Sequence, residues 1–217
     1  SYAEIKMLAT GNPYIKEKMD LDIQVQKLKL LKSNFLSERY ALEDKIIKYY
    51  PQRITALENR IEGLKQDVET AKQHPKPTDD RFVGMEVKGV FYSEKADAGK
   101  AIIETCKQMN SPDPIPLGKY RGFETELLFN TAERNYEVRL KGATSRNVPL
   151  GDDAHGNIIR LDNGIERFAE SLSLAENDLE NTKNQLETAK KEVQKPFIQE
   201  EELKTKLARL DELNILL

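Results

Sequence analysis

Basic side chains alternate with apolar ones in two segments near the middle of the chain. In residues 136–141 the apolar positions share one face of a predicted strand and leave Arg139 and Lys141 on the other. Lys119 and Arg121 have the same spacing in an earlier predicted strand. Cations in such an arrangement neutralise phosphates, and an aromatic ring nearby stacks on exposed bases. The candidate nucleic-acid-binding residues are Lys119, Tyr120, Arg121, Arg139, Lys141 and Arg146.

The same sheet face has a simpler interpretation. Glu124, Glu126 and Glu137 fall where cross-strand partners of these cations would lie. Sheet faces of mixed charge are usually only solvated. A nucleic-acid interface and a solvated face therefore both remain open.

Two glycine-containing segments carry weaker chemical signals. Residues 97–101 (DAGKA) are similar to part of a phosphate-binding loop, but the upstream glycine is replaced by Glu94 and no Ser or Thr follows Lys100. Residues 151–157 (GDDAHGN) offer two carboxylates and an imidazole to a divalent ion, yet other suitably spaced ligands are missing, which favours a turn with Asx hydrogen bonds. With two histidines, one cysteine and no serine in a nucleophile motif, we expect no catalytic site, metal or cofactor.

Two heptad patterns flank this central region and must position it. Each has two columns of mostly apolar residues seven apart, and the first pattern is interrupted at Glu43. Helices with so narrow an apolar stripe must pair to bury it. The first pattern consists of Tyr40, Ile47, Ile54, Ile61 and Val68 with Leu36, Tyr50, Leu57, Leu64 and Ala71. The second consists of Ile165, Leu172, Leu179, Leu186 and Val193 with Phe168, Ala175, Thr182 and Ala189.

The two helical segments are expected to pair with each other. They have similar lengths, and the central region joins the end of one to the start of the other, so the pairing is antiparallel and within one chain. A parallel homodimer is the competing arrangement, but it would bring two bulky central domains together. Pro51 and Pro196 should kink the first and second helix, respectively.

The region between the helices has the pattern of a small α+β domain. Residues 83–92 are predicted as one strand, and Ser93 as the cap of a helix over residues 94–109. Asp162 or Asn163 can cap the returning helix. Further strands are predicted at residues 117–121, 123–129, 136–141 and 147–150.

The predicted fold class is α+β, a long antiparallel coiled-coil helical hairpin with a small antiparallel-sheet-plus-helix domain inserted at its tip. Ser1 and Glu4 have the spacing of a capping box, while Gly11 can end a short first helix and Asn12, followed by Pro13, can cap the long one. The expected domains are a short N-terminal helix over residues 1–11, a first coiled-coil helix over 12–74, the tip domain over 75–161 and a second coiled-coil helix over 162–217.

Composition limits the classes of partner. A formal net charge of −3, from 34 basic and 37 acidic residues, gives no global field that would attract a nucleic acid or a membrane, so any such contact needs a local patch. Cys106 alone cannot form an internal disulfide and suits a reducing cytoplasm, where we expect it to be a buried packing residue. No apolar run approaches membrane-spanning length, and no secretory signal is present. From the lone cysteine we expect a cytoplasmic protein, and from the paired helices a monomer; because the chain begins with Ser1, we expect it to be a piece of a longer protein.

Short motifs spread over nearly the whole chain carry a family resemblance. They are residues 1–6 (SYAEIK), 9–13 (ATGNP), 16–19 (KEKM), 28–32 (LKLLK), 39–40 (RY), 50–51 (YP), 118–123 (GKYRGF), 140–142 (LKG) and 156–163 (GNIIRLDN). Together they resemble a segment that follows the motor of very large helicase–methyltransferase proteins of bacterial phages and integrative conjugative elements. In that family, an adenine-specific DNA methyltransferase module and an SNF2-like superfamily II helicase module precede this segment.

The resemblance implies an accessory arm rather than an isolated enzyme. The chain has no helicase Walker motif, no acidic box in a helicase context and no methyltransferase Asn/Asp-Pro-Pro-Tyr/Phe motif. The implied partners are DNA and the helicase and methyltransferase modules of the parent chain, and we expect the arm to position DNA or a module relative to the motor. A protein-interaction or assembly arm with no nucleic-acid role is the alternative, and an independent enzyme is disfavoured.

Overall fold

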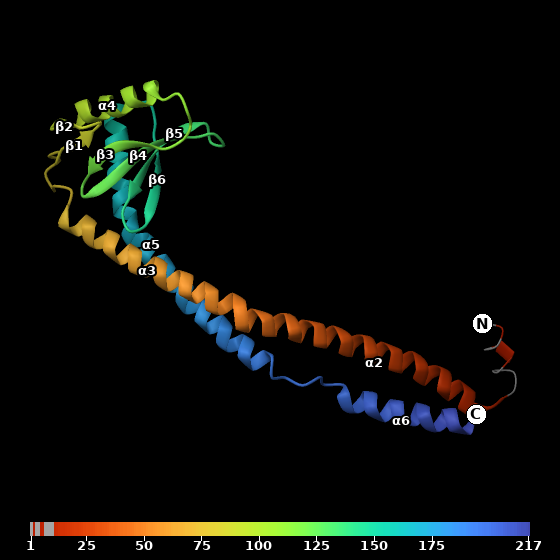
Figure 1. The fold of residues 1–217 in the computed structure, drawn as a ribbon. Coiled ribbons are helices and arrows are strands. Elements are labelled where there is room, and N and C mark those ends of the chain that lie inside the picture. Colours follow the sequence, from red (N-terminus) through yellow and green to blue (C-terminus); the bar gives the residue numbers. More distant parts are fainter. Residues whose placement is uncertain (1, 3–4, 7–10) are drawn as a thin grey trace. The chain divides into compact units, whose positions relative to one another are not determined.

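The computed structural model describes residues 2, 5–6 and 11–217. It confirms the α+β class, with a six-stranded antiparallel sheet among long helices (Figure 1). The predicted capping box at Ser1 and Glu4 lies outside the described residues. The elements are α2 (Pro13–Asp44), the π-helix η1 (Lys45–Tyr49), α3 (Tyr50–Gln73), β1 (Met85–Val87), β2 (Val90–Tyr92), α4 (Lys95–Gln108), β3 (Ile115–Tyr120), β4 (Phe123–Asn130), β5 (Asn135–Lys141), β6 (Ser145–Pro149), α5 (Ala154–Glu192) and α6 (Glu200–Leu216).

The chain divides into two units. Unit 1 comprises residues 1–52 and 183–217, and unit 2 comprises residues 53–182. Among the described helices, none has both the length and the apolar character that spanning a membrane requires.

Unit 1 contains an antiparallel helix pair. Helix α2 begins as predicted, because the Asn12 side chain accepts a hydrogen bond from the Tyr14 amide at 3.0 Å and proline occupies the first turn. Two ion pairs show that α2 and α6 are antiparallel, because the later residue of α2 contacts the earlier residue of α6. Glu17 binds Arg209, and further along Lys32 binds Glu200 at 2.9 Å. The apolar contact between the two helices is formed by Val25, Leu28 and Leu203, with Leu207 and Leu210 packed against it.

The phase of the apolar stripe changes at the π-helix. Tyr40 and Ile47 are 67% and 71% exposed, so their predicted place in a buried column is wrong. Downstream of η1 the predicted columns hold, and Leu57 and Leu64 are buried. A π-turn fits one extra residue into the helix and so rotates everything after it. Pro51, where a kink was predicted, lacks an amide donor and follows η1 closely. The irregularity that the structure shows there is the π-helix, which changes the phase of the apolar stripe.

Unit 2 contains a second antiparallel helix pair. Arg53 of α3 forms an ion pair with Asp178 of α5, whereas Ala71, near the end of α3, lines a cavity with Ile165, near the start of α5. The predicted columns of α5 are buried or half-buried along its length. Each helix of this pair therefore buries its stripe within the chain.

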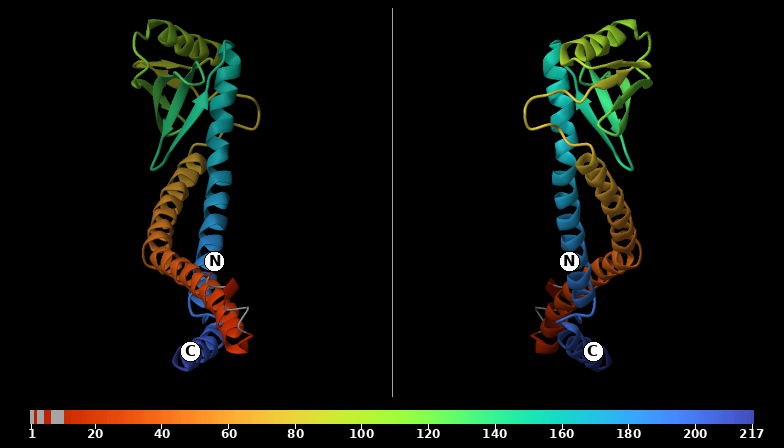
Figure 2. Two further views of the ribbon diagram at one scale, coloured as in Figure 1. Left: turned by 90° about the vertical axis from the view of Figure 1, so that its right-hand side faces the viewer. Right: turned by 90° about the vertical axis from the view of Figure 1, so that its left-hand side faces the viewer.

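The sheet has the strand order β2-β1-β3-β4-β5-β6, and every neighbouring pair is antiparallel. Helices α4 and α5 cover one of its faces (Figures 1 and 2). At the centre of the core, Phe123 of β4 stacks on Phe168 of α5 with ring centroids 5.1 Å apart. The other face of the sheet carries the charged side chains.

Two tight turns change the predicted strands. The single strand expected over residues 83–92 is wrong, because Lys88 and Gly89 have φ values of 51° and 82° and fold it into the β1–β2 hairpin. Arg121 and Gly122, with φ values of 45° and 81°, join β3 to β4 in the same way. Two successive residues with positive φ are typical of a type I′ turn. Helix α4 matches its prediction, but its N-cap is Glu94, not Ser93.

The returning helix also differs from its prediction. It begins at Ala154, where the Asp153 side chain accepts a hydrogen bond from the Gly156 amide at 2.8 Å, so neither Asp162 nor Asn163 is its cap. Pro196 interrupts rather than kinks the helical path, because residues 193–199 separate α5 from α6.

Helix α3 is fixed to the β5–β6 turn by a buried carboxylate. Asp67 is 1% exposed and accepts hydrogen bonds from the amides of Ala143 and Thr144 at 2.7 and 2.8 Å, and from the Thr144 hydroxyl. These bonds satisfy the turn's donors and fix the position of β6 relative to α3.

Candidate functional site

Three of the six candidate residues lie together on the face of the sheet that α4 and α5 do not cover, which we call the open face. Lys119 faces Glu124 across the β3–β4 pair, and Glu124 faces Lys141 across the β4–β5 pair. Arg139 faces Glu126 in the next row. The strands therefore bring Lys119, Arg139 and Lys141 together as the alternation predicted.

Each of these cations has a carboxylate partner. Glu126 binds Arg139 at 3.3 Å and Lys141 at 2.8 Å, and Glu124 lies 3.9 Å from Lys119. The hydrogen bond from Lys141 lowers the pKa of Glu126, and the charges of Lys141 and Arg139 add to the effect. A phosphate at this face would have to compete with these carboxylates.

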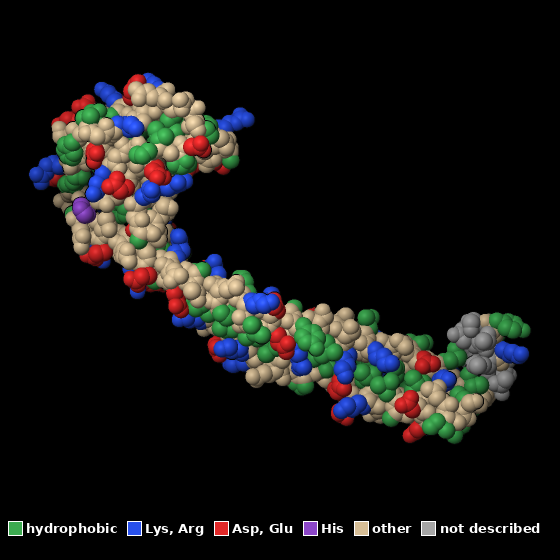
Figure 3. Space-filling view, viewed as in Figure 1, with side chains coloured by type: hydrophobic (Ala, Val, Ile, Leu, Met, Phe, Trp, Pro, Cys, Tyr) green, Lys and Arg blue, Asp and Glu red, His purple; other side chains and the backbone are tan. Residues whose placement is uncertain are grey.

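The open face is not positively charged as a whole. Glu137 accepts hydrogen bonds from Asn130 and Asn147, and Glu86 lies opposite Lys119 on β1. Acidic and basic side chains are interspersed over this unit in the space-filling view (Figure 3). The geometry favours the mixed-charge interpretation of this face.

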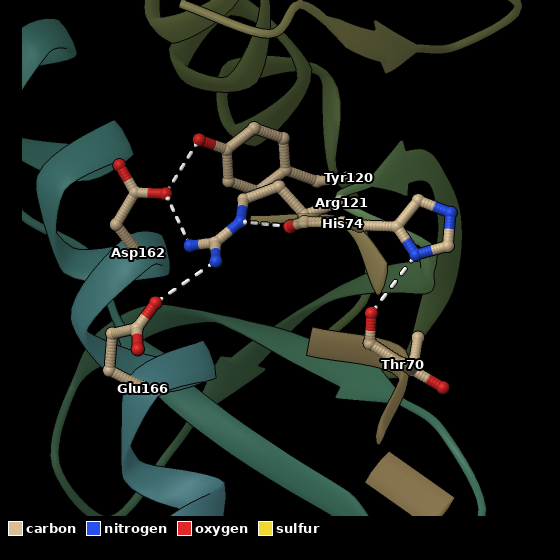
Figure 4. Close-up of polar contacts among 6 residues, drawn as sticks. All are labelled: Thr70, His74, Tyr120, Arg121, Asp162 and Glu166. Atoms are coloured by element: carbon tan, nitrogen blue, oxygen red, sulfur yellow. Dashed lines mark hydrogen bonds and ion pairs between the residues drawn. The ribbon is translucent and has the colours of Figure 1, made fainter. Parts of the chain in front are cut away.

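Arg121 lies elsewhere, so its predicted place beside Lys119 is wrong. The type I′ turn takes it out of the strand, and its side chain is only 2% exposed. Its guanidinium donates to Asp162 at 3.1 Å, to Glu166 at 2.9 Å and to the carbonyl of His74 at 2.9 Å (Figure 4). Arg121 therefore joins the end of α3, the β3–β4 turn and α5.

Tyr120 belongs to the same buried network. Its hydroxyl donates to the Asp162 carboxylate at 2.7 Å, on the oxygen that also accepts from Arg121 (Figure 4). Burial raises the pKa of Tyr120, and the negative charge of Asp162 raises it further. The ring is 2% exposed, so it is not available to stack on a base.

Arg146 occupies a third place. It lies on β6 and donates to the Arg167 carbonyl at 3.3 Å and to the Ser171 hydroxyl of α5. Its guanidinium carbon is 5.8 Å from the centre of the Phe168 ring. The six candidates thus fall on the open sheet face, in the buried network and beside α5.

The glycine-containing segments have structural roles. Residues 97–101 lie inside α4, and residues 151–157 contain the Asp153 cap of α5 together with Asn157, which binds both backbone groups of Gly151. Within the part of the chain that the structure describes, no three His, Cys, Asp or Glu side chains are grouped as a metal site would require.

Cys106 is the one thiol of the chain and lies in the core. It is 8% exposed on α4, and burial raises its pKa to about 11. At neutral pH it is therefore protonated and a poor nucleophile.

Sequence reasoning missed two arginines that the fold places near Arg146. Arg160 and Arg167 are seven residues apart on α5 and line one cavity with Arg146. Their heptad spacing was a usable signal, because residues seven apart share a helix face. Their proximity to β6 depends on tertiary packing.

Comparison of the chain with protein-family models, curated proteins and solved structures finds no match. The function of the site therefore has to be inferred from its geometry and from the sequence motifs.

We expect Arg121→Ala to destabilise the fold, whereas Lys119→Ala should not. Removing Arg121 leaves Asp162 buried without its ion-pair partner, which costs about 3–5 kcal/mol of unfolding free energy. Lys119 is 54% exposed in its side chain, and its loss should change that free energy by less than about 0.5 kcal/mol. Urea denaturation of both variants measures the difference. Equal midpoints would contradict a structural role for Arg121.

Cys106 should react slowly in the folded chain. With a pKa of about 11, the fraction of Cys106 that is thiolate at pH 8 is about a hundredfold lower in the folded chain than it is for an exposed cysteine. Since the folded pKa is raised, the neutral thiol stabilises the fold fully below about pH 9, and this contribution is lost as the pH rises towards about 11. Thiol-reagent kinetics with and without urea measure the first effect.

The variant Cys106→Ala isolates the pH effect. The difference in unfolding free energy between wild type and variant should be constant below about pH 9 and shrink above it. A difference that stays constant to pH 11, together with fast labelling of the folded chain, would contradict the burial of this thiol.

Proposed function

We propose that this chain is a non-catalytic accessory arm in which paired helices carry a small α+β unit that contacts nucleic acid. The observation that supports an arm is the antiparallel helix pairing found in each unit, by Lys32 with Glu200 in one and Arg53 with Asp178 in the other. The buried carboxylates that could otherwise take part in catalysis have structural partners. Asp67 holds a turn, and Asp162 holds Arg121 and Tyr120.

In this proposal the two helix pairs belong to one long antiparallel coiled-coil hairpin, with the sheet-bearing domain inserted between its helices. Helices α3 and α5 each contribute residues to both units, which supports continuity along the chain. The parallel-homodimer alternative would need these stripes to face a second copy, although partners within the chain already bury them.

The parent protein that we propose is a helicase–methyltransferase of a bacterial mobile element, acting in the cytoplasm. Two of the motifs that carry this resemblance meet in space, since residues 118–123 supply Tyr120 and Arg121 and residues 156–163 supply Asp162. A fully satisfied buried polar network helps to specify one fold, which supports a shared fold as the reason for these two motifs. The arm would position DNA, or a module of the parent chain, relative to the motor.

An assembly arm without nucleic acid is the second candidate. The pairing of the open-face cations with glutamates favours it, as does the short edge strand β2, where Val90 and Phe91 are 52% and 66% exposed. Apolar side chains at a sheet edge are typical of protein contacts.

Cross-linking tests the hairpin. In a Cys106→Ala background, the pairs Lys32→Cys with Glu200→Cys and Arg53→Cys with Asp178→Cys should each form an intramolecular link with a short bismaleimide, because each pair is in contact in the structure. The product should migrate as a monomer. Single Arg53→Cys is the control, since it can be linked only between chains. Covalent dimers from this single variant would favour the parallel homodimer.

Titration with DNA tests the function. The unmodified chain should bind single- or double-stranded oligonucleotides, and the logarithm of its affinity should fall linearly with the logarithm of salt concentration, by about 0.9 for each phosphate contact on a duplex. Fluorescence anisotropy at several salt concentrations measures this slope. No binding to either form at low salt would exclude the nucleic-acid role and favour the assembly arm.

A further inference from the structure

A cavity of about 240 Å³ lies between strand β6 and helix α5 in unit 2. Three of its lining residues are arginines, and none is acidic. Arg146 comes from β6, while Arg160 and Arg167 lie about two turns apart on one face of α5. Asn147 and Asn163 add amide groups to its wall. We call Arg146, Arg160 and Arg167 the arginine cleft.

The cations of the arginine cleft lack the carboxylate partners that several other arginines of this unit have. Arg53, Arg121 and Arg139 each form an ion pair. Among the described residues, no carboxylate forms an ion pair with any member of the arginine cleft. The three arginines therefore line one cavity without an ion-pair partner among the described residues.

Arg146 is the most constrained of the three. It is half-buried, and its Nε has no hydrogen-bond partner among the described residues although that atom is buried. Burial lowers the pKa of Arg146, and the positive charges of Arg167 and then Arg60 lower it further, while Glu170 opposes them. A bound anion would reduce this repulsion.

The cleft is built by close packing of α5 on β6. Gly164 lies so near Val148 that an added Cβ would come within 2.6 Å of its side chain, so only a glycine lets the helix approach. Asn157 accepts a hydrogen bond from Arg160 at 3.0 Å and thereby orients its guanidinium. The site is therefore partly organised before any ligand binds.

We propose that the arginine cleft binds a phosphate group, supplied by the backbone of the nucleic acid; this inference rests on the proposed function. The planar donor fork of a guanidinium matches the oxygens of a phosphate. A volume of about 240 Å³ suits one phosphate group, since pockets for whole small-molecule ligands are usually about 300–1,000 Å³. A free phosphate ion has the same chemistry and is the other possible source.

The arginine cleft is better suited to phosphate than the open sheet face. At the open face, phosphate would have to displace Glu126 from both Arg139 and Lys141. At the arginine cleft, a phosphate would have to break none of the ion pairs that the described residues form. Charged groups that already have partners contribute little net binding energy, because their desolvation offsets the new contact.

Matched double variants test this inference in the full chain. Arg160→Gln with Arg167→Gln should reduce the slope of log affinity against log salt by about 0.9 for duplex DNA, the contribution of one phosphate contact, and weaken binding about tenfold. The control Lys65→Gln with Lys100→Gln removes the same charge from exposed helix positions of unit 2 and should leave the slope unchanged. Thermal unfolding of both variants checks that the fold is retained.

A third variant, Lys119→Gln with Lys141→Gln, tests the open sheet face as the competing surface. If this variant lowers the slope and the Arg160/Arg167 variant does not, the inference is overturned while the proposed function stands. DNA binding that is equal in all three variants and wild type overturns it in the same way.

Inorganic phosphate separates the two sources of ligand. Titration with phosphate should shift the NMR signals of the Nε–H groups of Arg160 and Arg167. In the Arg160/Arg167 double variant, the signals of the remaining residues near the cleft should not shift. Phosphate binding without any DNA binding would support the anion site but overturn nucleic acid as its source, and with it the proposed function. No shift with phosphate and no effect of the variant on DNA binding would overturn the site.

Discussion

The buried guanidinium of Arg121 is the interaction on which unit 2 depends. A charge that is 2% exposed is stable only if its donors are satisfied, and Asp162, Glu166 and the carbonyl of His74 accept from it. Tyr120 shares the Asp162 oxygen. Because these partners come from α5 and the end of α3, a movement of either helix would leave a buried charge without its partner.

This constraint also determines what α5 presents to its surroundings. Asp162 and Glu166, four residues apart, face the buried network, whereas Arg160 and Arg167 line the cavity beside β6. One helix therefore carries the anions that fix its position and two arginines that form no ion pair with any described residue. Residues so close in sequence acquire opposite roles because successive residues of a helix point in different directions.

The parts of the fold that depend on periodicity were predictable, and those that depend on turns were not. The columns of α5 and the strands β3, β4 and β5 follow alternations that local sequence displays. The hairpin at Lys88 was missed, and Arg121 was placed in a strand instead of in the turn, because a lysine or arginine with positive φ does not carry the Asn-Gly signal of a type I′ turn. The exposed Tyr40 was missed because the π-helix changes the phase after it. On the open sheet face, the sequence indicated both the cations and the glutamates that could pair with them, but which glutamate binds which cation depends on strand register.

Arg121 and Arg146 show how burial distinguishes a structural cation from the binding cation that we propose. Arg121 has acceptors for all three nitrogens of its guanidinium, so a ligand could reach it only by breaking the fold. Arg146 is half-buried, its Nε has no partner among the described residues, and two further arginines lie on the wall of its cavity. Desolvation of a cation is tolerated when an anion compensates for it. In the first case Asp162 and Glu166 of the chain supply that anion, and in the second the open side of the cavity leaves room for it to come from outside.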